Sequence, residues 1–135
     1  MNKISIIIPI LNEATSISTI LSYLEKNAFQ NDKIEIIVVD GGSTDGSLDI
    51  IRANTQVKLI QTLKGRAKQM NLGAKEATGN ILYFLHCDSF PPPHFDLAIN
   101  DAVQKGNQAG CFRLKFDYKH IVLTVSQWFT RFNHI

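Results

Sequence analysis

Short apolar runs alternate with segments of helical spacing along the chain. The runs at residues 3–10, 34–40, 57–62 and 80–88 are rich in Ile, Val and Leu. Continuous apolar runs of this length are typical of strands buried on both faces of a parallel sheet. Alternating apolar positions at residues 109–118 predict a fifth strand with one exposed face.

Helical spacing predicts helices at residues 12–28, 43–54, 65–78 and 91–106, and a last helix from Lys119 onward. The expected buried side of the third helix consists of alanines and a methionine: Ala67, Met70, Ala74 and Ala77. The last helix is expected to expose an apolar face, made of Ile121, Val125, Trp128 and Phe132.

This alternation predicts an α/β domain with right-handed crossovers. We expect a three-layer α/β/α, Rossmann-like fold with a mostly parallel sheet. The 135 residues are 44% hydrophobic, which is enough for one domain with a real core.

Composition excludes several classes of protein. The net charge is only +2 and the basic residues are scattered, which gives no indication of a nucleic-acid partner. No run approaches the ~18 to 20 apolar residues of a membrane span. Cys87 and Cys111 stand alone, as in a reduced intracellular protein, and we expect both to be small packed residues.

The run "IEIIVVDGGSTDGS" ends its strand on Asp40 and continues as a polar, glycine-rich loop. Asp40 could simply cap the next helix. Ligands of such sheets, however, bind at the carboxyl ends of the strands, where a carboxylate can recognise a base or a ribose. A Rossmann loop would follow the first strand, and a Walker loop would have Lys where Ser47 stands, so neither phosphate motif is present.

Two further segments carry candidate chemistry. Lys64, Arg66 and Lys68 surround Gly65 at a predicted helix start, which suits a diphosphate, although a solvated basic helix end would look the same. His86 and Asp88 stand two apart in a predicted strand, so we expect them to point to one side. They could hold a divalent cation, although an H-x-D pair alone is a weak signal.

Together these pieces resemble the family 2 glycosyltransferases of GT-A fold. The resemblance rests on "SIIIPILNEATSI", "IIVVDGGSTDGS", "KGRAKQMNLGAKEATGNILYFLHCDS" and "PPPHF", in this order, over roughly the first 95 residues. It is strongest to a bacterial subgroup with "GRA-QMN" before the helix and "LHAD" in place of the usual D-x-D. His86 departs from the usual motif, because the first Asp normally stands there.

The resemblance implies a nucleotide-diphosphate sugar donor, an unknown glycan or lipid acceptor, inversion, and a divalent cation, Mg²⁺ or Mn²⁺. It assigns donor-binding roles to Pro9, Leu11, Glu13, Asp40, Gly41, Arg66, Gln69 and Asp88. Asp88 is the implied metal ligand, with His86 as a weaker one. The implied location is cytoplasmic, with the inner face of a membrane as an alternative.

The resemblance also suggests that residues 1–135 form the donor-binding part of a longer transferase. The "GDQ" segment and acidic pair of the subgroup, which carry the acceptor side and the catalytic base, do not occur in this sequence. The resemblance therefore places the catalytic base beyond Ile135 and assigns no catalytic residue to this chain.

We accordingly expect weak nucleotide binding without sugar transfer. Two alternatives stay open. One is a non-catalytic nucleotide-binding module. The other is a sugar nucleotidyltransferase, which would need a basic glycine-rich loop where "PILNEA" stands.

Overall fold

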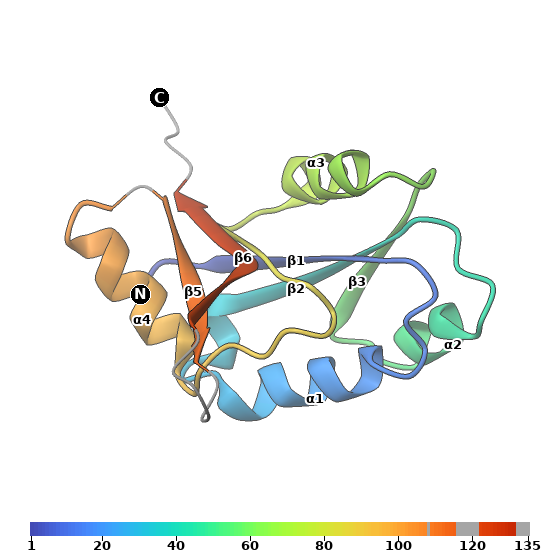
Figure 1. Cartoon of the computed structure of the whole chain (residues 1–135), viewed down its shortest axis with the longest axis horizontal. Coiled ribbons are helices and arrows are strands. Elements are labelled where there is room, and N and C mark those ends of the chain that lie inside the picture. The colour runs from blue at the N-terminus through green and yellow to red at the C-terminus, as the bar shows by residue number, and fades with distance from the viewer. Residues whose placement is uncertain (108, 116–121, 132–135) are drawn as a thin grey trace.

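The computed structural model describes residues 1–107, 109–115 and 122–131 (Figure 1). In this part of the chain the strands form one six-stranded sheet of order β3-β2-β1-β4-β6-β5. Four strands run parallel: β1 (Ile4–Ile10), β2 (Ile34–Asp40), β3 (Val57–Gln61) and β4 (Ile81–Phe84). Two are antiparallel to their neighbours: β5 (Ala109–Lys115) and β6 (Val122–Arg131).

Helices cover both faces of the sheet, as the alternation predicts. They are α1 (Ile17–Asn27), α2 (Ser47–Arg52), α3 (Arg66–Glu76) and α4 (Phe95–Gln104), with a short 3₁₀ turn at Asn31–Lys33. In Figure 1, α1 and α2 lie below the sheet and α3 lies above it. After β3 the chain crosses to the far side of β1, and a right-handed crossover in that reversed direction puts α3 on the opposite face.

The central strand β1 is apolar on both faces because each face has a helix layer to bury it. Ile4, Ile6 and Ile8 join the larger core cluster with α1, α2 and α4. Ile7 joins the smaller cluster beneath α3. Successive side chains of β1 point to opposite faces of the sheet, and each face has its own apolar core. The apolar residues of this strand therefore follow one another directly rather than alternating with polar ones.

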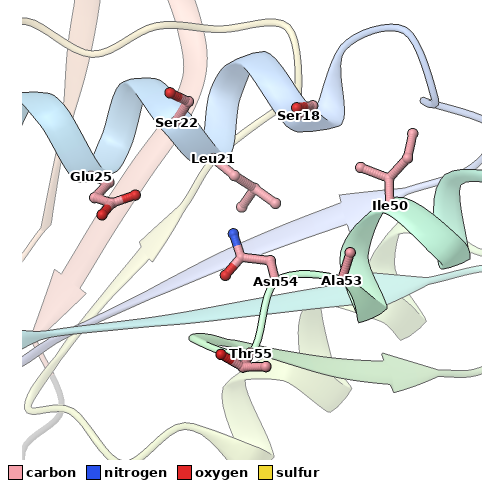
Figure 2. Close-up of a pocket in the computed structure, with 8 residues that line it drawn as sticks. All are labelled: Ser18, Leu21, Ser22, Glu25, Ile50, Ala53, Asn54 and Thr55. Atoms are coloured by element: carbon pink, nitrogen blue, oxygen red, sulfur yellow. The ribbon is translucent and has the colours of Figure 1, made fainter.

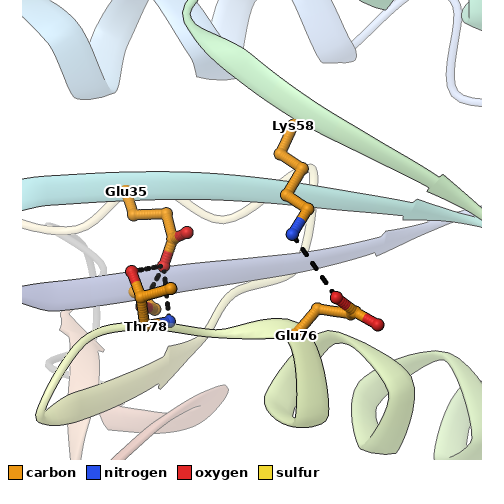
Figure 3. A network of polar contacts seen from close by, with 5 residues as sticks. Glu35, Lys58, Glu76 and Thr78 are labelled. Carbon is orange, nitrogen blue, oxygen red and sulfur yellow. Dashed lines mark hydrogen bonds and ion pairs between the residues drawn. The ribbon is translucent and has the colours of Figure 1, made fainter.

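Glu35 organises the amino-terminal edge of the sheet (Figure 3). Its Oε2 accepts hydrogen bonds from Ser5 Oγ at 2.6 Å and from Thr78 N at 2.9 Å. Burial opposes ionisation, but the bonds from Ser5 and Thr78 outweigh it and hold the pKa of Glu35 below its usual value. The exposed Lys58–Glu76 pair in the same figure is 3.5 Å long and adds little.

The predicted last helix is wrong, because residues 122–131 form the strand β6. Val122, Thr124, Val125, Trp128 and Phe129 are β-branched or aromatic, which favours a strand, and β6 pairs along both β4 and β5. The apolar face expected on that helix lies outside the described side chains.

The buried side of α3 also differs from the prediction. Ala67 is exposed, whereas Gln69 and Gly73 are the buried residues. Ala74 and Ala77 pack against the smaller core cluster, as expected. A small residue at 73 is required, since a Cβ there would lie 2.5 Å from Cγ2 of Ile7.

Candidate active site

The predicted site residues gather at the carboxyl ends of the four parallel strands. The chain order reverses between β1 and β4, which are neighbours in the sheet, so a crevice opens beyond their ends. The segments that leave these two strands carry Leu11 to Glu13 and His86 to Asp88. The topology therefore brings these predicted residues to one edge of the sheet, and their role in binding stays a prediction.

A pocket of about 280 Å³ lies at this edge and is lined by six of the predicted residues: Pro9, Leu11, Glu13, Arg66, Gln69 and His86. Ile10, Lys64 and Gly65 complete the lining. The pocket thus combines an apolar wall from β1 with cationic groups at the start of α3. Helix N–H groups and a guanidinium at one place are suited to a phosphate group.

Asp40 and Gly41 lie behind this pocket rather than in its lining. Asp40 is 1% exposed. Its Oδ2 accepts hydrogen bonds from Gly42 N at 2.9 Å and from Ser43 N at 3.0 Å. The carboxylate therefore orders the glycine loop. The simpler role considered from the sequence, a cap on the next helix, is wrong, because α2 starts at Ser47 and its N-cap residue is Gly46. Donor contact by Asp40 stays a prediction.

Gln69 has a structural task that its sequence position did not reveal. Its Nε2 donates to the carbonyl oxygens of Ile10 and Val39, at 2.8 Å in both cases. The side chain is 4% exposed and presses against Gly41, where a Cβ would lie 2.8 Å from Oε1. Gln69 thus ties α3 to the ends of β1 and β2.

Arg66 and His86 contact each other inside the pocket, with Nη2 of Arg66 2.6 Å from Nδ1 of His86. A guanidinium only donates, so Nδ1 accepts and the ring proton is on Nε2. Burial, followed by the charge of Arg66, lowers the pKa of His86, and Asp88 opposes this only in part. His86 is therefore neutral near pH 7, and its one free lone pair is already used.

The prediction that His86 and Asp88 share one side of a strand is wrong. β4 ends at Phe84, and both residues lie in the turn that follows, where Ser89 N donates to the carbonyl oxygen of His86 at 3.1 Å. His86 is partly buried, whereas Asp88 is exposed. Within the described residues, no three His, Cys, Asp or Glu side chains come together to form a metal site.

Cys87 lies between these two residues and is buried, as predicted; the side chain of Cys111 lies outside the described set. Burial, and then the charges of Glu13 and Asp88, raise the pKa of the Cys87 thiol to about 12. At pH 8 we expect Cys87 to react with iodoacetamide about a thousandfold more slowly than an ordinary thiol. Peptide mass spectrometry would test this, with urea-unfolded protein as the control. Rapid modification in the folded protein would contradict it.

A second pocket lies between α1 and α2, away from the predicted residues (Figure 2). It has a volume of about 350 Å³ and includes Leu21, Glu25 and Asn54. No cationic side chain lines it, so it lacks the groups that a diphosphate would need.

None of the described helices has the length and hydropathy needed to cross a bilayer.

The catalytic base is expected beyond Ile135, outside the part of the chain that the structure describes. The described residues end at Arg131, so Ile135, beyond which the base is expected, lies outside them. The placement of the base after Ile135 therefore stays a prediction.

Comparison with known proteins points to glycosyltransferases. The model of the family "Glycosyl transferase family 2" matches residues 5–131. Glycosyltransferase AglE of Haloferax volcanii is 33% identical over 94 residues, which cover 65% of this chain and 31% of that protein. The poly(ribitol-phosphate) beta-N-acetylglucosaminyltransferase TarS of Staphylococcus aureus is 32% identical over 96 residues, covering 67% of this chain and 17% of TarS.

Solved structures share the fold. The structure of TarS residues 1–349 matches with a TM-score of 0.76 and 26% identity, over 90% of this chain and 38% of that one. Mannosyltransferase PcManGT from Pyrobaculum calidifontis, in complex with GDP-Man and Mn²⁺, matches with a TM-score of 0.71 and 26% identity, over 84% of this chain and 36% of that one. TarS has also been solved with UDP-GlcNAc. The chain thus spans well under half the length of each of these proteins.

Proposed function

This chain belongs to glycosyl transferase family 2, and from that premise we propose that it binds a nucleotide-diphosphate sugar and serves an inverting, metal-assisted sugar transfer. The observation that carries the proposal is the pocket at the switch point of the sheet. It brings Lys64 and Arg66 together with the β1 wall and Glu13. The sugar donors in the TarS and PcManGT structures support the same ligand class.

The nucleoside is assigned to the wall formed by β1 and the loop behind it. Pro9 and Leu11 offer apolar contact, and Glu13 offers a carboxylate that can accept from hydroxyl or imide groups. Asp40 and Gly41 support this wall, since Gly41 N donates to the carbonyl oxygen of Ile10 at 3.0 Å, and we keep the proposal that Asp40 contacts the base. The diphosphate is assigned to the start of α3, beside Lys64 and Arg66.

A divalent cation fits this site only if the substrate helps to hold it. Mg²⁺ is commonly bound by one or two carboxylates together with substrate phosphates. Asp88 is an exposed carboxylate in the turn after β4, at the same edge of the sheet as the pocket. The lone pair on Nδ1 of His86 already accepts a hydrogen bond from Arg66. When bound, the cation would neutralise charge on the leaving diphosphate. Arg66 would place a second positive charge on the same group.

Inverting transfer also needs a carboxylate to take the proton of the acceptor hydroxyl. Two carboxylates outside the predicted site, Asp96 and Asp101, already form other contacts and do not line the pocket. Asp96 is buried and accepts from the backbone N of Phe29 at 2.9 Å, and Asp101 pairs with Lys105 at 2.9 Å. We therefore assign the described residues to donor binding, and we keep the proposal that the base follows Ile135.

The proposal is tested by titrating the protein with UDP and GDP in the presence and absence of Mn²⁺, using calorimetry. Transfer is then assayed with UDP- and GDP-sugars and a panel of glycan and lipid acceptors, with release of free nucleotide as the readout. We expect binding of at least one nucleotide diphosphate that strengthens with the metal. Absence of binding for every nucleotide would refute the proposed site.

Replacing Asp40 with Ala should weaken nucleotide binding by about 1 to 3 kcal/mol, the range for a lost charged hydrogen-bond partner. The buried carboxylate accepts from Gly42 N and Ser43 N, so its loss frees the loop as well as removing any contact to the base. Calorimetry with UDP and GDP measures the effect. Asp49→Ala, on the exposed side of α2, is the matched control. Unchanged affinity in Asp40→Ala would contradict the assignment.

A further inference from the structure

We infer that Asn12 is a positioning residue that fastens the loop after β1 to the glycine loop after β2. This inference rests on the proposed function, because the residues on either side of Asn12 line the proposed nucleotide pocket. Asn12 itself is exposed and is not part of that lining, whereas Leu11 and Glu13 are. Its effect on a ligand would therefore be exerted through its neighbours.

Four hydrogen bonds cross between the two loops. The side-chain Oδ1 of Asn12 accepts from Thr44 N at 2.7 Å, and its backbone N donates to Ser43 Oγ at 2.8 Å. The next two residues continue the series: Glu13 N donates to Ser47 Oγ at 3.0 Å, and Ala14 N donates to Asp45 Oδ2 at 3.0 Å.

Asn12 has a backbone conformation that few residues adopt. Its φ is +55°, in the left-handed region, where Asn and Asp are the commonest residues other than Gly. This conformation lets the side chain of Asn12 and the backbone of Glu13 and Ala14 all face the second loop. It also keeps Asn12 out of a helix, whereas the sequence predicted a helix starting near residue 12; α1 starts at Ile17.

The buried end of the same two loops is held by a different residue. Gln69 bridges the carbonyl oxygens of Ile10 and Val39, just before the loops separate. Asp40 then orders the turn at Gly42 and Ser43, so that the Ser43 hydroxyl and the Thr44 N–H meet Asn12. With both ends fixed, the wall that carries Leu11 and Glu13 cannot separate from the glycine loop.

Three variants separate the hydrogen bond from the backbone conformation. Asn12→Gly tolerates the positive φ but loses the acceptor for Thr44 N. Asn12→Asp keeps both an acceptor oxygen and tolerance of the conformation. Asn31→Gly is a control, since Asn31 is an exposed asparagine whose amide bonds to Glu25 O, outside these loops. Calorimetry with UDP and GDP in Mn²⁺, hydrogen exchange of residues 43–47, and thermal unfolding are measured for each variant.

We expect Asn12→Gly to bind the better nucleotide about three- to tenfold more weakly, the equivalent of one lost hydrogen bond. Its amides at 43–47 should exchange faster, while its unfolding temperature stays close to that of Asn31→Gly. Asn12→Asp should bind within about twofold of the wild type. If Asn12 did not hold the two loops together, its replacement would leave hydrogen exchange of residues 43–47 unchanged.

Two results would overturn the inference. One is unchanged affinity and exchange in Asn12→Gly. The other is an equal loss of affinity in Asn12→Gly and Asn12→Asp with unchanged exchange, which would mean that the amide touches the nucleotide directly. Wild-type protein that binds no nucleotide diphosphate would instead refute the proposed function, and the exchange data would still show whether Asn12 fastens the loops.

Discussion

Asp88→Asn should abolish the metal-dependent part of nucleotide binding. The substitution keeps the size of the side chain but removes the charge and one hard oxygen ligand, which Mg²⁺ and Mn²⁺ favour. Within the described residues no cluster of three ligating side chains exists to replace it. Calorimetric titration with UDP and GDP, with Mn²⁺ and with EDTA, measures the effect: the difference between the two conditions should disappear in the variant.

His86→Ala is the informative comparison, and its loss should be smaller. Nδ1 of His86 accepts from Arg66, so a metal could reach that lone pair only if Arg66 moved away. Asp101→Asn, in an exposed pair with Lys105 on α4, controls for the loss of one negative charge. Equal losses in the Asp88 and His86 variants would make His86 a full ligand. Metal dependence that survives in both would disprove the metal site.

Gly73→Val should lower the free energy of unfolding by about 3 kcal/mol, the upper part of the usual range for overpacking a core. A Cβ at this position would lie 2.5 Å from Cγ2 of Ile7 and 3.1 Å from Cγ2 of Val39. Both are buried strand residues, so α3 would have to lift from the sheet. Chemical denaturation followed by circular dichroism gives the value.

Ala67→Val is the control, because it introduces the same side chain on the exposed side of the same helix. The helix-propensity terms of the two substitutions differ by only about 1 kcal/mol. Ala67→Val should change stability by well under 1 kcal/mol. A lifted α3 would also move Gln69 and Arg66, so Gly73→Val should lose nucleotide affinity under conditions where it is still folded. A variant as stable as Ala67→Val would show that the gap between helix and sheet can adapt.

The sequence predicted the layers of the fold and the edge of the sheet at which the candidate residues gather. Four apolar runs, each followed by helical spacing, allow few arrangements other than a parallel sheet, and this determined where strands such as the one ending at Asp40 would terminate. The helix predicted for residues 122–131 was wrong because the apolar positions of this segment fit a helix as well as a strand. What decides between them is pairing with β4, whose partner residues lie 44 to 50 positions earlier and are not part of the local spacing.

The site shows the same division. Six predicted residues line one pocket because each lies close to a strand end or at the start of α3. The tasks of Gln69 and Asn12 were not predictable, because their partners are backbone groups about 30 or more residues away. Backbone C=O groups are present at every position and N–H groups at every position except proline, so such partners cannot be recognised in a sequence.

The bond from Gln69 to two backbone carbonyls has a consequence for how this site can diverge. Because the amide reads Ile10 O and Val39 O rather than side chains, substitutions at the pocket-lining positions Pro9 and Leu11 need not disturb the attachment of α3. If the β1 wall binds the base as proposed, preference for one base over another can change there while the proposed phosphate-binding end of α3 keeps its place. A single glutamine thus allows the two halves of the proposed donor pocket to evolve separately.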